Sequence, residues 1–436
     1  MPWDIRLLVI EHPVPLHGKE IPAAEFYVGA MMLGRMLRRP AVIVLCSINL
    51  VIMIGYGLIM PVLPFYAGSM GANGTQLGLL FASYSMTQFL LSPYWGRFSD
   101  RSGRRPVILW GLLGFALTFL LFGLANNLLL LFIARLLGGG LSCAAIPASM
   151  AYMADVTDES ERGDGMALMG TSAGLGIVLG PIIGGYLAEV SIELPFFVAT
   201  GITLLIAVAA FFFLPESLDD DSRNKQILSP AAKLKNFGRR SQLAEPLGFL
   251  LILTLAINFA SANLESTFGL FLEARLGFGG REVGLAFTVA GVAMVLAQGF
   301  IVGPMIKRFG EESLIVLGLV FSATSYLFLL IAQNLAGLLL IMGTMAFLTS
   351  GMRPAMSTLF SKRTSAQDQG LIQGEQNRYA ALGRIVGPFT GGLLFDVAGS
   401  ASPYIFGALI YFGGLIASTK YLNWRKPQIG VPLSTD

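Results

Sequence analysis

The chain has 436 residues, of which 54% are hydrophobic and only 13% are charged. Soluble domains carry about 25% charged residues, so this composition indicates a protein that crosses a membrane many times and excludes a large soluble domain. The formal net charge of +3 says little, because the distribution of Lys and Arg between loops matters more than their sum. We expect no nucleic-acid partner.

The sequence offers few side chains for redox or metal chemistry. Both cysteines, Cys46 and Cys143, lie inside apolar runs, where a thiol is a small packing group and no disulfide framework is implied. The two histidines, His12 and His17, precede the first apolar run, so a histidine-based centre within the membrane is excluded. We therefore expect no metal and no cofactor.

Residues 1–40 contain several prolines and mixed charges, but no long apolar core followed by a small-residue cleavage site. They do not have the pattern of a secretory signal, and we expect a cytoplasmic tail. Three methionines, Met31, Met32 and Met36, are alternative starts, so the sequence leaves open whether residues 1–35 belong to the mature protein.

Twelve apolar segments follow, each long enough to cross a bilayer as a helix, which takes roughly 20 residues. They are residues 41–63, 76–95, 106–125, 128–153, 166–188, 195–214, 247–272, 281–305, 313–333, 336–360, 369–395 and 402–422. The longest polar break divides them six and six. The predicted parts are the N-terminal tail 1–40, a six-helix bundle 41–214, a cytoplasmic linker 215–246, a second six-helix bundle 247–422 and a C-terminal tail 423–436.

Lys and Arg alternate between the loops. The loops at 64–75, 126–127, 189–194, 334–335 and 396–401 contain neither residue, whereas the loops between them carry most of the basic side chains. Loops rich in Lys and Arg stay in the cytoplasm. Both termini are therefore predicted to be cytoplasmic, in a multi-pass protein of the inner or plasma membrane.

A short basic stretch separates the second and third apolar segments. It reads Gly96-Arg97-Phe98-Ser99-Asp100-Arg101-Ser102-Gly103-Arg104-Arg105. Two glycines permit close backbone approach and unusual dihedral angles, and the acidic residue can accept hydrogen bonds from the free N–H groups of a helix start. The stretch is predicted to be a tight hairpin between two membrane helices.

This hairpin resembles the signature loop of the major facilitator superfamily, G-x-L-a-D-r-x-G-r-r, with Phe98 where Leu is usual. The resemblance implies an all-α membrane fold of twelve transmembrane helices in two pseudo-symmetric six-helix bundles. The matching residues, implied to act in gating, are Gly96, Asp100, Arg101, Gly103, Arg104 and Arg105.

Asp155 ends the fourth apolar segment and is expected to pair with Arg101 or Arg104. In the superfamily such a pair holds the outward-facing state closed on the inside, and a hairpin at a moving interface is a bistable element. The alternative is an ordinary surface ion pair, worth about 0–1 kcal/mol.

The two halves of the chain are related by an offset of 207 positions. The pairs are Gly96 and Gly303, Arg101 and Arg308, Gly103 and Gly310, Pro147 and Pro354, Gly176 and Gly383, Gly180 and Gly387, and Gly184 and Gly391. Two parallel six-helix repeats imply a substrate site near the midplane between them and alternating access by rocking. The second hairpin has Glu311-Glu312 where the first has paired Arg, which suggests that the first hairpin is the main latch.

The fifth apolar segment has small residues on one face. They are Gly176, Gly180, Pro181, Gly184 and Gly185. Such a face allows close helix packing in lipid, and packing alone is one interpretation. The spacing G-x3-G-P-x2-G-G also resembles the antiporter motif of drug/proton exchangers in the superfamily.

The first segment, from Gly55 to Pro64, and the same glycine motif resemble tetracycline/proton antiporters. The chain departs from those antiporters in its membrane-embedded acids. The matching positions hold Ile52, Thr118 and the uncharged stretch 321–326.

Three ionisable residues lie clearly within apolar segments: Arg135, Glu265 and Arg384. Buried ionisable groups in membranes usually pair and mark ion pathways. The hypothesis is that Glu265 carries the proton, with Arg384 or Arg135 adjusting its affinity. The alternative is that Glu265 reaches the outer interface or forms a static pair.

Polar or aromatic residues on inward faces are candidates to line the substrate cavity, although each alone is more often a packing residue. The candidates are Asn49, Tyr56, Gln88, Asn258, Phe268 and Asn377.

The favoured interpretation is a monomeric secondary transporter that exports drug-like or amphipathic small organic molecules in exchange for protons. The alternative is a superfamily carrier for a metabolite such as a sugar, amino acid or siderophore, by antiport or uniport. A membrane enzyme is disfavoured, because no P-loop, metal-site spacing or nucleophile-elbow motif occurs. The sequence names neither the substrate nor the coupling stoichiometry.

Overall fold

The computed structural model describes residues 14–16, 19–21, 36, 39–218, 247–365 and 368–422. In the N-terminal tail, strands β1 (Val14–Leu16) and β2 (Lys19–Ile21) pair antiparallel. Most of the predicted linker 215–246 and all of the predicted tail 423–436 lie outside the described residues.

The first half of the chain forms six helical rods, one of which consists of two helices joined through a short 3-10 turn. They are α2 (Pro40–Ser69), α3 (Gly74–Ser102), α4 (Arg104–Gly123), α5 (Leu128–Leu141) continuing through η2 (Ser142–Ala144) into α6 (Ala145–Val156), α7 (Arg162–Val190) and α8 (Leu194–Phe213).

The second half repeats this plan. Its rods are α10 (Leu247–Leu276), α11 (Gly280–Ala297) continuing through the π-helical turn η5 (Gln298–Val302) into α12 (Gly303–Phe309), α13 (Glu311–Leu329), α14 (Leu335–Thr349) followed by α15 (Met352–Lys362), α16 (Gln369–Ala398) and α17 (Ser402–Tyr421).

Each rod contains one of the twelve predicted apolar segments, and eleven of the rods are long and apolar enough to span a membrane. The remaining rod is α3, whose last turns carry the charged residues of the hairpin. The predicted all-α membrane fold is confirmed: the protein crosses the membrane many times.

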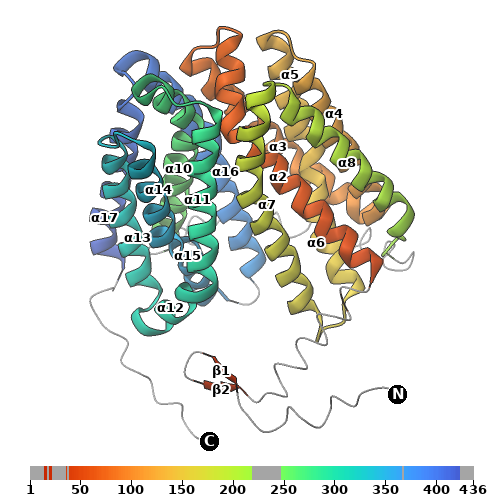
Figure 1. The fold of residues 1–436 in the computed structure, drawn as a ribbon. Helices are drawn as coiled ribbons and strands as arrows, with labels where there is room; N and C mark the ends of the chain where they lie inside the picture. Colours follow the sequence, from red (N-terminus) through yellow and green to blue (C-terminus); the bar gives the residue numbers. More distant parts are fainter. Residues whose placement is uncertain are drawn as a thin grey trace, which may run out of the picture.

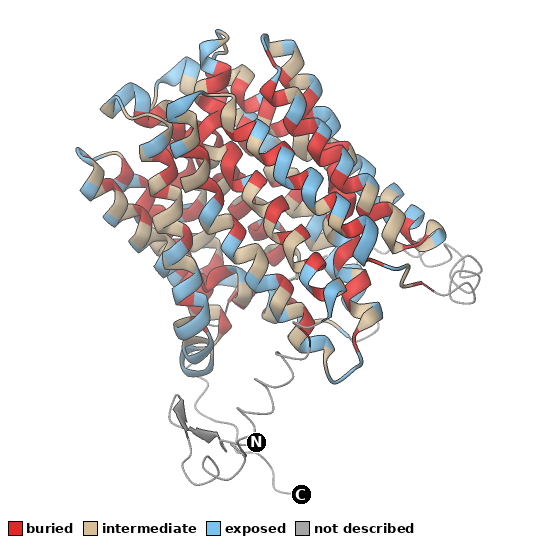
Figure 2. Ribbon diagram, turned by 45° about the vertical axis from the view of Figure 1, so that its right-hand side comes forward, coloured by how far each residue is buried: buried red, intermediate tan, exposed pale blue. Residues whose placement is uncertain are grey.

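The helices gather into two groups, α2 to α8 on one side and α10 to α17 on the other (Figure 1). One cluster of buried apolar residues spans Val42 to Leu214, and a second spans Leu250 to Leu422. Figure 2 shows buried residues running through both groups. We call the two groups the first bundle and the second bundle.

Local geometry repeats at the offset of 207 positions. Gly103 and Gly310 both adopt positive φ, at 101° and 78°, at the turn between two helices. Asn127 and Asn334 both cap a helix by accepting a hydrogen bond from a backbone N–H three residues on. Because residues with a side chain rarely adopt positive φ, the two hairpins need glycine at this turn.

The two bundles touch over one half of their length, from one end to about the middle, where a β-carbon on Gly174 of α7 would lie 3.7 Å from the Val295 side chain of α11. We call the end that holds residues 96–105 the hairpin end and the opposite end the far end. A β-carbon placed on Gly74 of α3 would lie 2.7 Å from the Asp396 carboxylate of α16, and one placed on Gly185 of α7 would lie 2.7 Å from the Gly280 carbonyl of α11. These contacts close the far end.

The helices α3, α7, α11 and α16 meet at the far end. At the hairpin end, glycines of these helices and of the continuation of α11 face open space. No atom lies within 4 Å of a β-carbon placed on Gly96, Gly163, Gly170, Gly299, Gly303, Gly370 or Gly374. The last turns of α3 and the first turns of α16 are correspondingly exposed. The structure is therefore closed at the far end and open at the hairpin end.

Candidate functional site

The glycine motif of α7 brings that helix against α2. A β-carbon on Gly176 would lie 2.5 Å from the Met53 β-carbon, and one on Gly180 would lie 2.5 Å from the Ile54 carbonyl oxygen. The Pro181 ring packs against Gly57, since a β-carbon there would lie 2.8 Å from it. The motif therefore packs two helices within the first bundle.

The same motif also reaches across the bundle boundary. Gly185 contacts Gly280 of α11, and its counterpart Gly392 on α16 contacts Gly74 of α3. The carbonyl groups of Pro181 and Pro388 likewise contact Gly284 and Gly78 of the opposite bundle. Gly184 stays within its bundle, against Leu58.

Two carboxylates bridge the bundles at the far end. Asp396 accepts hydrogen bonds from the backbone N–H groups of Gly74 (2.9 Å) and Thr75 (2.8 Å) and from the Thr75 hydroxyl (2.6 Å), so it caps α3 from the other bundle. Glu189 on α7 pairs with Arg281 on α11 at 3.3 Å. The two carboxylates are 207 positions apart, and we call these contacts the far-end clamps.

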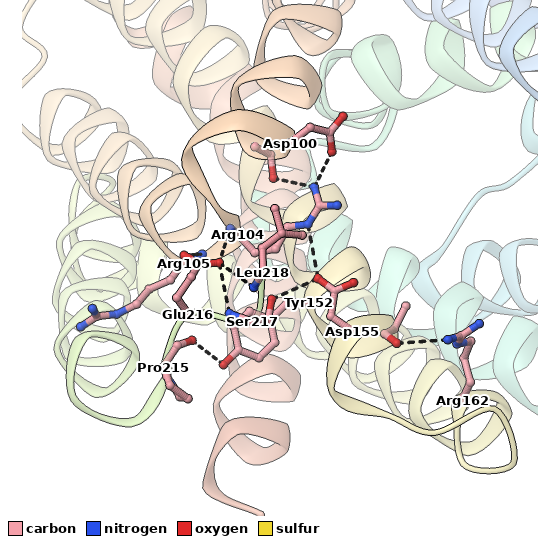
Figure 3. A network of polar contacts seen from close by, with 12 residues as sticks. Asp100, Arg104, Arg105, Tyr152, Asp155, Arg162, Pro215, Glu216, Ser217 and Leu218 are labelled. Atoms are coloured by element: carbon pink, nitrogen blue, oxygen red, sulfur yellow. Dashed lines mark hydrogen bonds and ion pairs between the residues drawn. The ribbon is translucent and has the colours of Figure 1, made fainter. Parts of the chain in front are cut away.

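The first hairpin is held by a polar network centred on Arg104 (Figure 3). Its guanidinium donates to Asp100 (2.7 Å) and Ser99 (3.0 Å) and forms a longer ion pair with Asp155 at 3.5 Å. The Ser217 hydroxyl also donates to Asp155. The predicted pairing of Asp155 with Arg104 is thus present.

Residues after α8 complete this network. The Glu216 carboxylate accepts from the backbone N–H groups of Arg104 and Arg105 and so caps α4. Arg105 donates to the Phe211 carbonyl at 2.6 Å and stacks over its ring. Arg101 is exposed. The hydrogen bonds and ion pairs described here for Arg104, Arg105 and Asp155 all lie within the first half of the chain.

The second hairpin carries the reversed charge arrangement. Glu311 pairs with Lys362 at 2.6 Å and Glu312 pairs with Arg363. Glu311 and Lys362 stand 207 positions after Arg104 and Asp155. The second hairpin therefore has ion pairs of its own, with acid and base exchanged relative to the first, and which hairpin is the main latch stays a prediction.

A partly open cavity lies between the bundles, toward the far end, with a volume of about 430 Å³ that includes the open space at its mouth. The first bundle contributes aromatic and apolar walls and the Arg135 guanidinium, and the second contributes the Glu265 carboxylate and the Arg384 guanidinium. The lining residues are Tyr56, Ile59, Met60, Phe81, Tyr84, Ser85, Arg135, Ala262, Glu265, Arg384 and Pro388. All three predicted intramembrane ionisable residues therefore meet at one cavity.

Arg135 reaches this cavity from α5 and is only 4% exposed. Its guanidinium carbon lies 4.8 Å from the ring centre of Phe81 and 5.6 Å from that of Tyr84. Its Nε is buried without a hydrogen-bond partner. Among the described residues no carboxylate pairs with it, so aromatic faces provide its main stabilisation.

Glu265 on α10 accepts a hydrogen bond from the Tyr56 hydroxyl of α2 at 3.3 Å, which joins the two bundles inside the cavity. Arg384 on α16 donates to the Asn258 amide oxygen at 3.4 Å. Arg353 on α15 acts electrostatically on Glu265. Sequence reasoning missed Arg353, although a charged residue within the tenth apolar segment was the signal that could have found it.

Of the predicted lining residues, only Tyr56 lines the cavity. Asn49 is buried and donates to the Met169 carbonyl at 2.6 Å, and Asn258 is buried beside Arg384. Phe268 is fully buried and packs on Phe287 within the second core. Gln88 and Asn377 lie nearer the hairpin end, outside the lining. As substrate contacts these residues stay predictions, since nearly uniform apolar helices do not reveal their inward face.

Comparison with known families settles the class of protein. The model of the Major Facilitator Superfamily matches residues 45–279 and 250–435. The chain belongs to the Major Facilitator Superfamily. Its members are transporters, so the protein is not an enzyme.

Curated relatives in the superfamily carry resistance names. The chain is 32% identical to Multidrug resistance protein 2 of Bacillus subtilis (strain 168), over 86% of this chain and 93% of that one. It is 27% identical to Quinolone resistance protein NorA of Staphylococcus aureus (strain COL), over 81% of this chain and 89% of that one.

Solved superfamily structures share the fold. The human organic anion transporter MFSD10 (TETRAN) superposes with a TM-score of 0.62 at 24% identity, covering 87% of this chain and 99% of that one. The inward-facing, occupied bacterial homologue of the human lysosomal transporter Spinster superposes with a TM-score of 0.69 at 15% identity, covering 87% and 95%. At these identities the likeness concerns the fold alone.

Proposed function

We propose that this superfamily transporter exports drug-like small organic molecules in exchange for protons by alternating access. The observation that carries the proposal is a carboxylate, Glu265, at a cavity between two bundles that touch toward the far end and separate toward the hairpin end. The resistance names of relatives that match over most of their length support an organic cargo.

Glu265 is the proposed proton carrier. It lies in the membrane-embedded part of the chain, where a carboxylate is costly unless it is protonated or paired. One proton moving inward releases about 2.3 kcal/mol per 100 mV. This energy sustains a cargo gradient of roughly 50-fold, since about 1.36 kcal/mol corresponds to tenfold.

The two ends of the molecule are the proposed gates. The far-end clamps hold one gate shut here, and the hairpins with their ion pairs are proposed to shut the other. The distribution of Lys and Arg supports a cytoplasmic hairpin end, in the plasma membrane. Rocking of the two bundles as separate bodies then alternates access, and we propose a monomer as the working unit.

Proteoliposomes test the proposal. Purified protein is reconstituted with a pH-sensitive dye in the lumen, and norfloxacin is added on one side. Norfloxacin movement is expected to drive proton movement in the opposite direction, and Glu265→Gln is expected to abolish that exchange at unchanged protein yield. Exchange by the Glu265→Gln variant at the rate of the parent protein would reject Glu265 as carrier, and the absence of proton movement with norfloxacin would reject the function.

A further inference from the structure

A group of hydroxyls lies inside the second bundle, behind Glu265. The Tyr411 hydroxyl of α17 lies 3.5 Å from the Ser261 hydroxyl of α10, and the Tyr411 ring packs edge-on against Tyr326 of α13, with 5.3 Å between ring centres. The Tyr326 hydroxyl donates to the Ala260 carbonyl oxygen at 2.8 Å. Tyr326 and Tyr411 are both buried. These side chains lie outside the lining of the cavity between the bundles.

The equivalent positions of the first bundle are apolar. The residues 207 positions before Ser261, Glu265 and Tyr326 are Ile54, Leu58 and Phe119. Phe119 is buried in the core of the first bundle, as Tyr326 is in the core of the second. The same arrangement of helices therefore packs without these polar groups. The hydroxyls accompany the carboxylate, in the bundle that contains Glu265, and are not required by the fold.

Glu265 can reach Ser261 by a change of its own rotamer. The two residues are four apart on α10, so they lie one above the other on the same face of the helix. Side chains of a helix lean toward its N-terminus, which directs Glu265 over the turn that holds Ser261. Both residues are partly exposed, whereas residues 262–264 between them are buried. A carboxylate that turns away from the cavity therefore meets the Ser261 hydroxyl and, beside it, that of Tyr411.

The present hydrogen-bond donor to Glu265 belongs to the opposite bundle. The Tyr56 hydroxyl of α2 donates to the carboxylate at 3.3 Å. One turn nearer the far end, Gly269 of α10 meets Pro64 of α2, since a β-carbon on Gly269 would lie 2.9 Å from the Pro64 ring. Opening the far end separates α2 from α10 at this contact, and Tyr56 moves away with α2. An ionised carboxylate inside a membrane then needs another partner.

We propose that Ser261 and Tyr411 form a second hydrogen-bonding position for the Glu265 carboxylate: Tyr56 holds it while the hairpin end is open, and Ser261 and Tyr411 hold it while the far end is open. Both are positioning residues, and the inference rests on the proposed export function. When the cargo leaves on the far side, the ionised carboxylate accepts hydrogen bonds from the two hydroxyls. A proton from far-side water then binds to the carboxylate, these bonds weaken, and the neutral carboxyl returns to Tyr56.

Charged and titratable groups on several helices surround Glu265. Those of the first bundle are Tyr56, Tyr84 and Arg135, and those of the second, besides Tyr411, are Tyr326, Arg353 and Arg384. When the far end opens, the first set moves away with its bundle, whereas Arg353 and Arg384 stay in the bundle of the carboxylate. Removing the Ser261 and Tyr411 hydroxyls therefore changes neutral donors only and leaves the fixed charges in place.

The pH dependence of exchange on each side of the membrane tests the inference. Norfloxacin exchange is measured in oriented proteoliposomes while the far-side pH is varied at constant hairpin-side pH, and then the reverse. Ser261→Ala combined with Tyr411→Phe is expected to raise the far-side pH of half-maximal exchange by about one unit, because a carboxylate that loses a hydrogen-bond donor holds its proton about tenfold more tightly. The hairpin-side profile is expected to match that of the parent protein. Tyr56→Phe is expected to shift the hairpin-side profile instead.

Tyr404→Phe is the matched control. Tyr404 lies seven residues before Tyr411 on the same face of α17, and its ring packs on Phe271 with 4.4 Å between ring centres. Its substitution removes the same phenol oxygen from the same core and is expected to leave both profiles unchanged. Ser261→Ala alone keeps every ring, so it decides the matter if the double variant does not fold, and it is expected to shift the far-side profile in the same direction.

Two results overturn the inference while the export function stands. One is a far-side profile of the Ser261→Ala protein identical to that of the parent protein. The other is an equal far-side shift in the Tyr404→Phe protein. Absence of any proton exchange with norfloxacin in the parent protein overturns both the inference and the proposed function.

Discussion

Several glycines of this protein matter because they have no side chain at a helix–helix contact. On α7, Gly180 lies against the backbone of α2, whereas Gly170 on the same helix faces open space. Replacing each of them by Ala therefore distinguishes the effect on helix packing from the intrinsic cost of glycine in a helix. That cost is about 1 kcal/mol relative to Ala.

Gly180→Ala is expected to destabilise the protein by about 1–3 kcal/mol, because its β-carbon would lie 2.5 Å from the Ile54 carbonyl oxygen and 2.9 Å from the Gly57 α-carbon. Gly170→Ala is the matched control and is expected to be neutral or slightly stabilising. Thermal unfolding in detergent measures both. A Gly180→Ala protein as stable as the control would show that the contact between α7 and α2 accommodates a methyl group at little cost.

At the scale of elements, the two hairpins have an ion pair at equivalent positions, with the acid and the base exchanged. Arg104 and Asp155 in the first correspond to Glu311 and Lys362 in the second, and both pairs join the start of one helix to the end of another in the same bundle. The surroundings differ, because Arg104 also binds Asp100 and Ser99. The second hairpin shows that the reversed order is compatible with this turn.

Arg104→Glu alone is expected to slow transport about fivefold or more, since a partly exposed ion pair is worth about 1 kcal/mol and the variant also places an acid beside Asp100 and Asp155. Adding Asp155→Lys is expected to recover most of that loss. Initial rates of norfloxacin exchange measure both. Single Asp155→Lys is the control, and a double variant no better than Arg104→Glu would mean that the pair itself contributes nothing.

Much of the molecule at this scale could be predicted from the sequence. Span length, the hairpin glycines and the offset of 207 positions depend on local composition and on repetition, which the chain displays directly. The inward face of each helix could not be predicted, as Phe268 and Asn49 show, because helices with apolar residues all round leave their rotation undetermined. Glu189, Arg281 and Asp396 were missed because their partners come from the other bundle.

At the scale of the whole molecule, closure of one end depends on a few contacts between bundles. Asp396 accepts three hydrogen bonds from the start of α3, and the Glu189–Arg281 pair links α7 with α11. Hydrogen bonds to a charged group contribute about 1.5–3 kcal/mol each. Removing the far-end clamps should therefore shift the balance between the two open states.

Asp396→Asn combined with Glu189→Gln is expected to raise far-side access to the cavity at least about tenfold. Met60 lines the cavity, so Met60→Cys in a background lacking Cys46 and Cys143 reports access. Labelling by a membrane-impermeant thiol reagent from each side of oriented vesicles gives the measurement. The same cysteine with intact clamps is the control. Unchanged far-side labelling would show that the clamps do not hold this gate shut.

The closed end is sealed partly by main-chain atoms. Carbonyl groups of Pro181 and Pro388 touch Gly284 and Gly78, so no flexible side chain fills these two crossings. A seal of this kind does not depend on rotamer changes at these two crossings. We expect such a barrier to limit ion leakage during each cycle and so to preserve the membrane voltage.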